Sequence, residues 1–349
     1  MRSFRYDNIP LSAYSEACIQ AQSKLHEYRG RFDALRQPYC ALLDSLECSA
    51  LVDSVDASLR IDGIYMDKQR IAEVIEGAKP LTDRERQAAG YGRILRAFRL
   101  EPEKFAIDAS TFLAMHTVLL GGVPAKGGSS YRQKDYLDMM IDGRVQRVPA
   151  SPVLAFETPL YLGSACDNLA SAFDTNPVKR LFLIPTFTVD VMCIKPFDEG
   201  TARLCRAFSS LLMEKAGIDI YRYVSIDRLC EQRANEYYDA LNQCLESWSS
   251  AKCNYSAYVS FWLSCVQEAY ETIFRLIGAN PNRVTSKTQK VKDFFAMQTG
   301  QHTKQQVMQA LPDVSVSTIE NSLAALVKEG YLEKLGRGRS TSYRRCGEK

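Results

Sequence analysis

The segment from residue 194 to residue 206 contains the residue types of an anion-binding site. Its sequence is Ile-Lys-Pro-Phe-Asp-Glu-Gly-Thr-Ala-Arg-Leu-Cys-Arg, in which Pro196 interrupts an apolar helical stretch and a second helix follows. Free amides at the start of a helix attract phosphate, and Arg203 and Arg206 can add charge-assisted hydrogen bonds. Glu199 is of the type that binds Mg²⁺. The alternative is a plain helix–loop–helix junction, with solvated arginines and a surface pair between Glu199 and Arg203.

Histidine is scarce in this chain, which limits the chemistry available. The 349 residues include three histidines, His26, His116 and His302, too few for a histidine-based metal site or catalytic triad. His116 lies on an amphipathic segment, where we expect it to pack rather than to act as a base. Any catalysis must therefore depend mainly on lysine, arginine and carboxylate side chains.

The segment resembles the signature of the Fic (Fic/Doc-like) family, His-Pro-Phe-x-Asp/Glu-Gly-Asn-Gly-Arg-x-x-Arg. The positions that match in unbroken register are Pro196, Phe197, Glu199, Gly200, Arg203 and Arg206. The positions that differ are Lys195 for the histidine, Thr201 for the asparagine and Ala202 for the second glycine.

The resemblance implies transfer of AMP from ATP, held with Mg²⁺, to a Ser, Thr or Tyr hydroxyl of another protein. It assigns the metal to Glu199. The residues that it assigns to the phosphates are Gly200, Thr201, Ala202, Arg203 and Arg206. Tyr238 lies on a stretch similar to the family's helix near the adenine pocket, and a core position is the alternative for this tyrosine.

Lys195 decides how much of this activity is expected. In the family the histidine removes a proton from the target hydroxyl, whereas a lysine with an ordinary pKa near ~10.4 is charged at neutral pH. Lys195 is a base only if its pKa falls far enough; otherwise it is a fixed cation that contacts phosphate. We therefore expect a nucleotide-binding protein whose catalysis is impaired or altered. The competing function is a DNA-binding transcriptional regulator in which the Fic fold is a sensor or interaction module.

A second motif, upstream, resembles the family's inhibitory Ser-x-x-x-Glu-Gly helix. Ser58 and Asp62 match it, with Asp in place of Glu. In the family the glutamate pairs with the second arginine and blocks productive seating of the nucleotide. Because Asp62 is one methylene shorter, we expect its bridge to Arg206 to be longer or absent. The alternative is that Ser58 and Asp62 are exposed at a helix end.

A third motif extends the resemblance to about residues 50–245. Tyr131 and Arg132 precede residues 136–148, where an Asp-Gly pair between short apolar runs favours a hairpin. This hairpin corresponds to the family's flap, which aligns the target segment by strand addition.

Apolar residues recur at three- and four-residue spacing along most of the chain, which predicts a mostly α fold. We expect a Fic-type helical bundle with one β-hairpin flap. The expected helices span residues 15–46, 67–76, 83–99, 111–120, 160–173, 178–191, 203–216, 230–248 and 255–277. The expected divisions are an N-terminal helical region of residues 1–100, a Fic core of residues 101–280 and a C-terminal module of residues 281–349.

The C-terminal module is basic, with 12 Lys and Arg against 6 Asp and Glu, whereas the preceding residues have a net charge of −3. Helices over residues 291–297 and 303–311, a third opened by a capping box at 317–320, and a two-stranded wing resemble winged helix–turn–helix domains that bind DNA. The candidate DNA contacts are Thr318, Asn321, Arg337 and Arg339. Protein docking or dimerisation is the alternative use of such a module.

Composition places the chain among folded globular proteins, with 46% hydrophobic and 24% charged residues. Its 11 cysteines include no CxxC pair and are expected to be reduced thiols. No stretch approaches the ~18 apolar residues of a membrane helix, and the first residues have no apolar signal region. We expect a cytoplasmic protein without membrane association. Its expected partners are a nucleotide and an unidentified protein target, with DNA and a second copy of the chain as further candidates.

Overall fold

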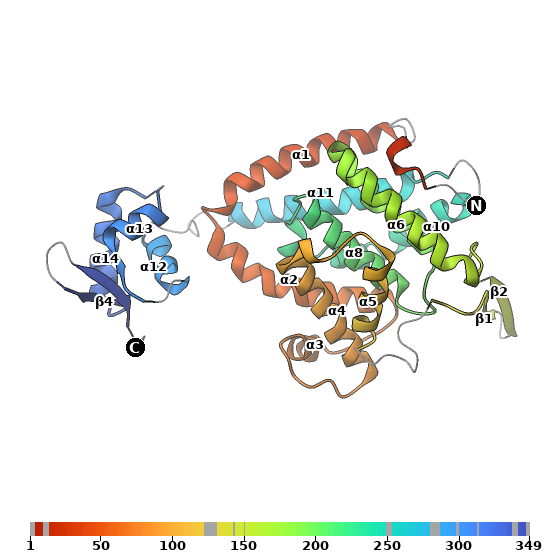
Figure 1. Cartoon of the computed structure of the whole chain (residues 1–349), viewed down its shortest axis with the longest axis horizontal. Helices are drawn as coiled ribbons and strands as arrows, with labels where there is room; N and C mark the ends of the chain where they lie inside the picture. The colour runs from red at the N-terminus through yellow and green to blue at the C-terminus, as the bar shows by residue number, and fades with distance from the viewer. Residues whose placement is uncertain are drawn as a thin grey trace. The chain divides into compact units, whose positions relative to one another are not determined.

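The structure is a computed structural model that describes most of the chain. The described residues are 4–9, 14–121, 131–141, 144–149, 151–248, 253–279, 287–297, 300–312, 314–336 and 341–346. The chain divides into two compact units, one of residues 1–32 and 44–275 and the other of residues 33–43 and 276–349 (Figure 1). The predicted division between residues 280 and 281 lies outside the described residues, and the finer division at residue 100 stays a prediction.

The larger unit is built mainly from helices, with short 3₁₀ turns between them. The helices are α1 (Glu16–Arg36), α2 (Cys40–Ile61), α3 (Lys68–Ile75), α4 (Asp83–Leu100), α5 (Ala109–Leu119), α6 (Thr158–Thr175), α7 (Arg180–Ile194), α8 (Thr201–Lys215), α9 (Ile226–Gln232), α10 (Ala234–Trp248) and α11 (Ser256–Ala279). The 3₁₀ turns are η1 (Tyr6–Asn8), η3 (Pro102–Lys104), η4 (Ala155–Glu157), η5 (Pro177–Lys179) and η6 (Ile220–Arg222). The predicted mostly helical architecture is confirmed, and no described helix is long and apolar enough to cross a membrane.

Two of the predicted helices are each divided in the structure. The helix predicted over residues 15–46 is wrong as a single element, because the chain turns between α1 and α2 at Pro38. Proline has no N–H to donate and disfavours helical backbone at the residue before it. The helix predicted over 230–248 is likewise divided at Arg233, whose φ of −112° and ψ of 38° depart from helical values.

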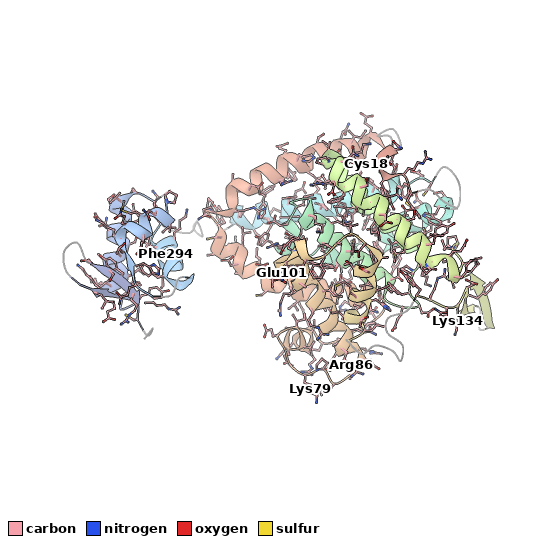
Figure 2. All side chains as sticks on the ribbon, viewed as in Figure 1. Cys18, Lys79, Arg86, Glu101, Lys134 and Phe294 are labelled. Carbon is pink, nitrogen blue, oxygen red and sulfur yellow. The ribbon has the colours of Figure 1, made fainter. Side chains whose placement is uncertain are left out.

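Helices α7 and α8 lie at the centre of the unit and position the 194–206 segment. Helix α7 is buried along nearly its whole length, and it packs against α6, α8 and α10. Three buried rings join α5, α7 and α8: Phe112 lies 4.2 Å from Phe208 and 6.0 Å from Phe187, centroid to centroid. Full burial of one such side chain stabilises the fold by about 1.5–3 kcal/mol. Side chains fill the space between these helices (Figure 2).

A buried carboxylate anchors other segments to α7. Asp190 accepts hydrogen bonds from the Tyr6 hydroxyl at 2.7 Å, the Trp248 indole N–H at 2.7 Å and the Tyr255 hydroxyl at 2.8 Å. A buried charge is tolerated only when its hydrogen-bonding capacity is satisfied. Asp190 therefore connects the N-terminal turn, the end of α10 and the segment before α11.

The predicted hairpin is present. Strand β1 (Tyr136–Ile141) pairs antiparallel with β2 (Arg144–Pro149), in a register that places Tyr136 opposite Pro149 and Ile141 opposite Arg144. The Asp-Gly turn expected at residues 142–143 lies outside the described residues.

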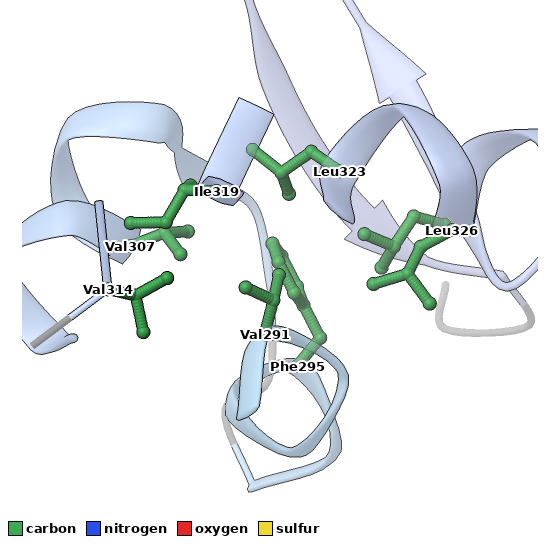
Figure 3. Packing of buried hydrophobic residues seen from close by; sticks show 8 residues of the cluster. Val291, Phe295, Val307, Val314, Ile319, Leu323 and Leu326 are labelled. Atoms are coloured by element: carbon green, nitrogen blue, oxygen red, sulfur yellow. The ribbon is translucent and has the colours of Figure 1, made fainter. Parts of the chain in front are cut away.

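Among its described residues, the smaller unit contains three helices and a three-stranded antiparallel sheet in addition to its contribution from α1, α2 and α11. Its elements are α12 (Lys287–Met297), β3 (His302–Thr303), α13 (Lys304–Ala310), α14 (Val316–Lys328), β4 (Leu332–Leu335) and β5 (Ser342–Arg345), with strand order β3-β5-β4. Its core comprises Val291, Phe295, Val307, Val314, Ile319, Leu323, Leu326 and Leu332 (Figure 3).

The predicted cap of the third helix is wrong by two residues. Ser315, rather than a capping box at 317–320, accepts the Thr318 N–H. The apolar residues Val314, before the cap, and Ile319, in the first turns, both belong to the core. Their packing fixes the start of the helix in the manner of a hydrophobic staple. The predicted Arg337 and Arg339 lie outside the described residues.

Candidate functional site

The loop from Lys195 to Gly200 connects α7 to α8 and begins with an unusual backbone conformation. Lys195 ends α7 with φ of 46° and ψ of 67°, and its N–H donates to Val191 O at 2.9 Å. Among the described residues it is the only non-glycine with positive φ. This left-handed conformation costs an L-residue about 1–2 kcal/mol. The surrounding structure must therefore hold the loop in place.

Arg132, at the base of the hairpin, holds the loop from one side. Its side chain is 1% exposed, its Nε donates to Lys195 O at 2.9 Å, and its backbone N–H donates to Pro196 O at 2.8 Å. A third donor, Nη2, bonds Val153 O. Buried Arg132 thus joins the base of the hairpin to the loop through hydrogen bonds.

An aromatic stack supports the loop from within. The Phe197 ring is fully buried, 3.9 Å from the His116 ring at an interplanar angle of 6° and 6.2 Å from the Tyr131 ring at 8°. Nε2 of His116 lies 3.1 Å from Glu199 O. Burial lowers the pKa of His116, which favours the neutral ring at this position. The packing role expected for His116 is confirmed.

The start of α8 leaves several backbone amides available. Gly200 precedes the helix with φ of 77°, and a Cβ on it would lie 2.8 Å from the Leu119 side chain, so glycine is required there. The Thr201 hydroxyl bonds the Phe197 backbone at 3.3 Å. Within the described residues, no acceptor is recorded for the amides of Thr201, Ala202 and Arg203. This helix terminus has the geometry that attracts anions.

Asp62 bridges the two arginines of the segment. Its Oδ2 accepts from Arg203 Nε at 2.7 Å, and its Oδ1 accepts from Arg206 Nη2 at 2.9 Å. Arg203 also donates to Gln87 Oε1 at 2.7 Å, and Arg206 Nε donates to Ser58 Oγ at 2.8 Å. Arg203 is 3% and Arg206 6% exposed, so these contacts are shielded from water.

Several expectations for these residues are wrong. We expected the Asp62 bridge to Arg206 to be longer or absent, but Asp62 follows the last residue of α2, where Gly63 has φ of 75°. The carboxylate there lies beyond the helix and reaches both guanidinium groups. The alternative in which Ser58 is exposed at a helix end is wrong, because Ser58 is fully buried. A surface pair between Glu199 and Arg203 is wrong because Arg203 is buried and bonds Asp62.

The interior around Arg206 contains further ionisable groups. Burial disfavours its charge, but Asp62 and neighbouring groups raise the pKa of Arg206 well above its usual value. The Tyr91 hydroxyl donates to Asp227 at 2.8 Å, and burial raises the pKa of Asp227. For the buried Nη1 of Arg206, the described residues provide no hydrogen-bond partner within normal geometry. Arg206 is therefore a cation held in a tightly packed interior.

Tyr238 and Gln87 come to the site from distant parts of the sequence. Tyr238 is 42% exposed, and its hydroxyl donates to Ile61 O at 2.7 Å, next to Asp62. The alternative core position for Tyr238 is therefore wrong. Sequence reasoning missed Gln87, because nothing in the local spacing distinguishes it from other polar residues at the start of α4.

Glu199 is available for a metal ion together with a phosphate group. Its side chain is exposed, and it has no recorded side-chain partner among the described residues. The described part of the chain contains no cluster of three or more His, Cys, Asp or Glu suited to a metal. Mg²⁺ is commonly held by one or two carboxylates plus phosphates and waters. Glu199 therefore fits the part of a single protein carboxylate in a Mg²⁺ site of this kind.

The Lys195 side chain is partly buried, and its ammonium has no recorded hydrogen bond or ion pair within the described residues. Burial lowers the pKa of this group, and the charge of Arg132 lowers it further, whereas Asp198 acts in the opposite direction. The uncharged fraction of the Lys195 amine is therefore larger than that of an ordinary lysine at the same pH.

Comparison with known proteins identifies the fold. No family model and no curated protein matches the sequence. A Fic family protein from Desulfovibrio desulfuricans G20 is similar in structure, with a TM-score of 0.60 and 20% identity over 96% of this chain and 97% of that chain. A Fic domain-containing signaling protein from Bacteroides thetaiotaomicron has a TM-score of 0.56 and 13% identity, covering 71% of this chain and 95% of that chain. Fic-1 from C. elegans has a TM-score of 0.55 and 16% identity, covering 76% and 73%. The chain therefore has a Fic fold, as predicted.

Proposed function

We propose that this Fic-fold protein binds a nucleotide, ATP with Mg²⁺, in the manner of protein AMP transferases, and that its catalysis is impaired or altered. The observation that carries the proposal is the Asp62 bridge, with contacts of 2.7 and 2.9 Å to Arg203 and Arg206. Two buried cations share one carboxylate next to a helix N-terminus. The two guanidinium groups and the free amides at the start of α8 are donors of the kind that bind the phosphates of a nucleotide.

The proposed roles follow the positions of the residues. The amides of Thr201 and Ala202, together with Arg203 and Arg206, bind phosphate after Asp62 gives up the arginines. Glu199 holds Mg²⁺, which would neutralise phosphate charge. Tyr238 lies at the edge of the same region and contacts the base. Asp62 is the inhibitory residue, because its carboxylate and a phosphate compete for the same donors.

The impairment follows from Lys195. The family's histidine accepts a proton from the target hydroxyl, whereas Lys195 must first lose its own proton to do so. Burial and Arg132 lower the pKa of Lys195 and so favour that loss. An unidentified protein target would align along the β1–β2 hairpin, whose outer edges can accept another strand.

Calorimetry on the full chain tests nucleotide binding. ATP, ADP and a cytidine nucleotide are titrated with Mg²⁺ into the unmodified protein and Asp62→Ala. We expect tighter binding of ATP by the variant, since its arginines are released. Absence of binding by both folded proteins would refute the proposal. Incubation with labelled ATP, with Lys195→His for comparison, then distinguishes impaired from altered catalysis.

The second candidate function is DNA-binding transcriptional regulation through a winged helix at the C-terminus. Its support is the order of helices and strands in residues 287–346 and the exposed Asn321 on α14. Thr318 contributes less, because its hydroxyl lies 2.7 Å from the capping Ser315 hydroxyl, and Glu320 is an exposed acid on the same helix. Salt-dependent retardation of duplex DNA by the full chain, weakened in Asn321→Ala, is the expected result. No retardation at low salt would exclude this candidate.

A further inference from the structure

Lys195 combines a backbone held by several hydrogen bonds with a side-chain amine that has no hydrogen bond or ion pair to the described residues. Its N–H bonds Val191 O at 2.9 Å, and its carbonyl accepts Arg132 Nε at 2.9 Å. The next carbonyl, of Pro196, accepts the Arg132 N–H at 2.8 Å. A strained residue held by so many contacts commonly belongs to a functional site. Its Nζ, in contrast, has no recorded bond in the described part of the chain.

The surroundings of Lys195 favour reactivity. The side chain is partly buried, and the permanent charge of Arg132 disfavours a second positive charge. Asp198 favours the charged form, and it is exposed to solvent, which screens its effect. Desolvation next to another cation is the environment that activates lysine amines as nucleophiles.

We propose that Lys195 is itself the acceptor of the nucleotidyl group, so that the protein attaches AMP to its own lysine. This inference rests on the proposed binding of ATP. A histidine at this position helps a hydroxyl to attack, whereas a primary amine can attack directly. The substitution of Lys for His then changes the acceptor from a hydroxyl oxygen of another protein to a nitrogen of this chain.

The uncharged Nζ of Lys195 attacks the α-phosphorus of ATP and forms an N–P bond. The bond from the α-phosphorus to the bridging oxygen breaks, and pyrophosphate leaves with the electron pair. The surplus proton on the nitrogen passes to solvent. No oxidant or reductant is involved, and the product is a lysine phosphoramidate.

Asp62 controls this step in the proposal. While it bridges Arg203 and Arg206, the donors needed for the phosphates are occupied. Self-modification is therefore expected to be slow in the unmodified chain and faster in Asp62→Ala. Asp62→Asn, which keeps the size of the side chain and removes its charge, serves as a second activated variant.

Intact-mass measurement and peptide mapping test the proposal. Full-length Asp62→Ala, or Asp62→Asn if the first variant does not fold, is incubated with ATP and Mg²⁺. We expect the mass of one AMP on the peptide that contains Lys195, with release of pyrophosphate. The adduct should be lost in mild acid, to which a phosphoramidate is labile, and it should survive alkali. The adduct should be absent from Lys195→Met and from Lys195→Arg. Lys195→Arg is the matched control, because it keeps the positive charge and removes the primary amine.

A second measurement needs no nucleotide. The pH profile of acylation by an amine-reactive probe is followed for Lys195 and for the control Lys104, whose pKa is raised by Glu101. We expect the midpoint of the Lys195 profile at lower pH; one unit corresponds to about a tenfold larger uncharged fraction. A midpoint for Lys195 at or above that of Lys104 would count against the proposal.

The outcomes separate the two proposals. Nucleotide binding by calorimetry without an adduct overturns the lysine acceptor and leaves the proposed function in place. An adduct on a hydroxyl residue, stable in mild acid, also overturns the lysine acceptor and supports ordinary AMP transfer. Absence of nucleotide binding overturns both.

Discussion

Replacement of Asp62 by alanine is the sharpest test of the site. The carboxylate is bonded by Arg203 at 2.7 Å and Arg206 at 2.9 Å, and its side chain is 19% exposed. Removing one partner of a buried ion pair costs about 3–5 kcal/mol. Both arginines keep another acceptor, Gln87 or Ser58, which places the loss near the lower limit. We expect Asp62→Ala to lower the free energy of unfolding by about 3 kcal/mol.

The same change should make the protein responsive to nucleotide. A ligand at 100 times its dissociation constant stabilises the folded state by about 2.7 kcal/mol. Saturating ATP with Mg²⁺ should therefore restore most of the stability that Asp62→Ala loses. The unmodified protein should respond less, because its arginines are already occupied.

Urea unfolding followed by circular dichroism, with and without ATP, measures both effects. Glu101→Ala is the control, and Glu101 is labelled in Figure 2. This change removes the acid of an exposed pair with Lys104 at 2.5 Å, so we expect little change in stability with or without nucleotide. A loss for Asp62→Ala below about 1 kcal/mol, the range of surface ion pairs, would refute the buried bridge. An equal response of both proteins to ATP would refute its inhibitory role.

Three further predictions concern the scaffold. Gly200→Ala should lower the free energy of unfolding by about 1–2 kcal/mol, because φ at this position is 77°. Gly163→Ala lies in a helix with open space around it and should raise the free energy of unfolding by about 0.5–1 kcal/mol. Thermal unfolding of both variants tests these opposite changes. Asp190→Ala should lower the free energy of unfolding, measured with urea, by at least about 3 kcal/mol, since three buried donors lose this acceptor. A smaller loss would contradict the importance of these three hydrogen bonds. Burial raises the pKa of Asp56, but hydrogen bonds from two arginines outweigh it and lower the pKa overall. Its stabilisation is therefore present above the unfolded value of about 3.9 and is lost as pH falls through the lower folded value, so Asp56→Asn should flatten the acid limb of a stability–pH curve.

Much of the local structure could be predicted from the sequence, because short-range preferences determine it. The spacing of apolar residues indicated most helices, and Pro196 followed by Gly200 indicated a loop and a new helix. The hairpin was also predicted, from an Asp-Gly pair between two short apolar runs. The errors in the helices concern where a helix ends or begins, which the spacing of apolar residues did not determine. Examples are the break at Pro38 and the N-cap at Ser315.

The sequence alone determined that residues 194–206 contain the residue types of an anion-binding turn, with a lysine where the resemblance predicts a histidine, since residue types and their order are local facts. Only the tertiary structure decided what the arginines bind. Arg203 forms hydrogen bonds with Asp62, 141 positions away in the sequence, and with Gln87, 116 positions away. Arg132 forms one with Lys195, 63 positions away. Such contacts depend on how α2, α4 and the hairpin base pack around α8, and no local spacing specifies that packing. The physical reason is that a charged side chain must have a hydrogen-bonding or oppositely charged partner once it is buried, and folding alone brings such partners together from distant parts of the sequence.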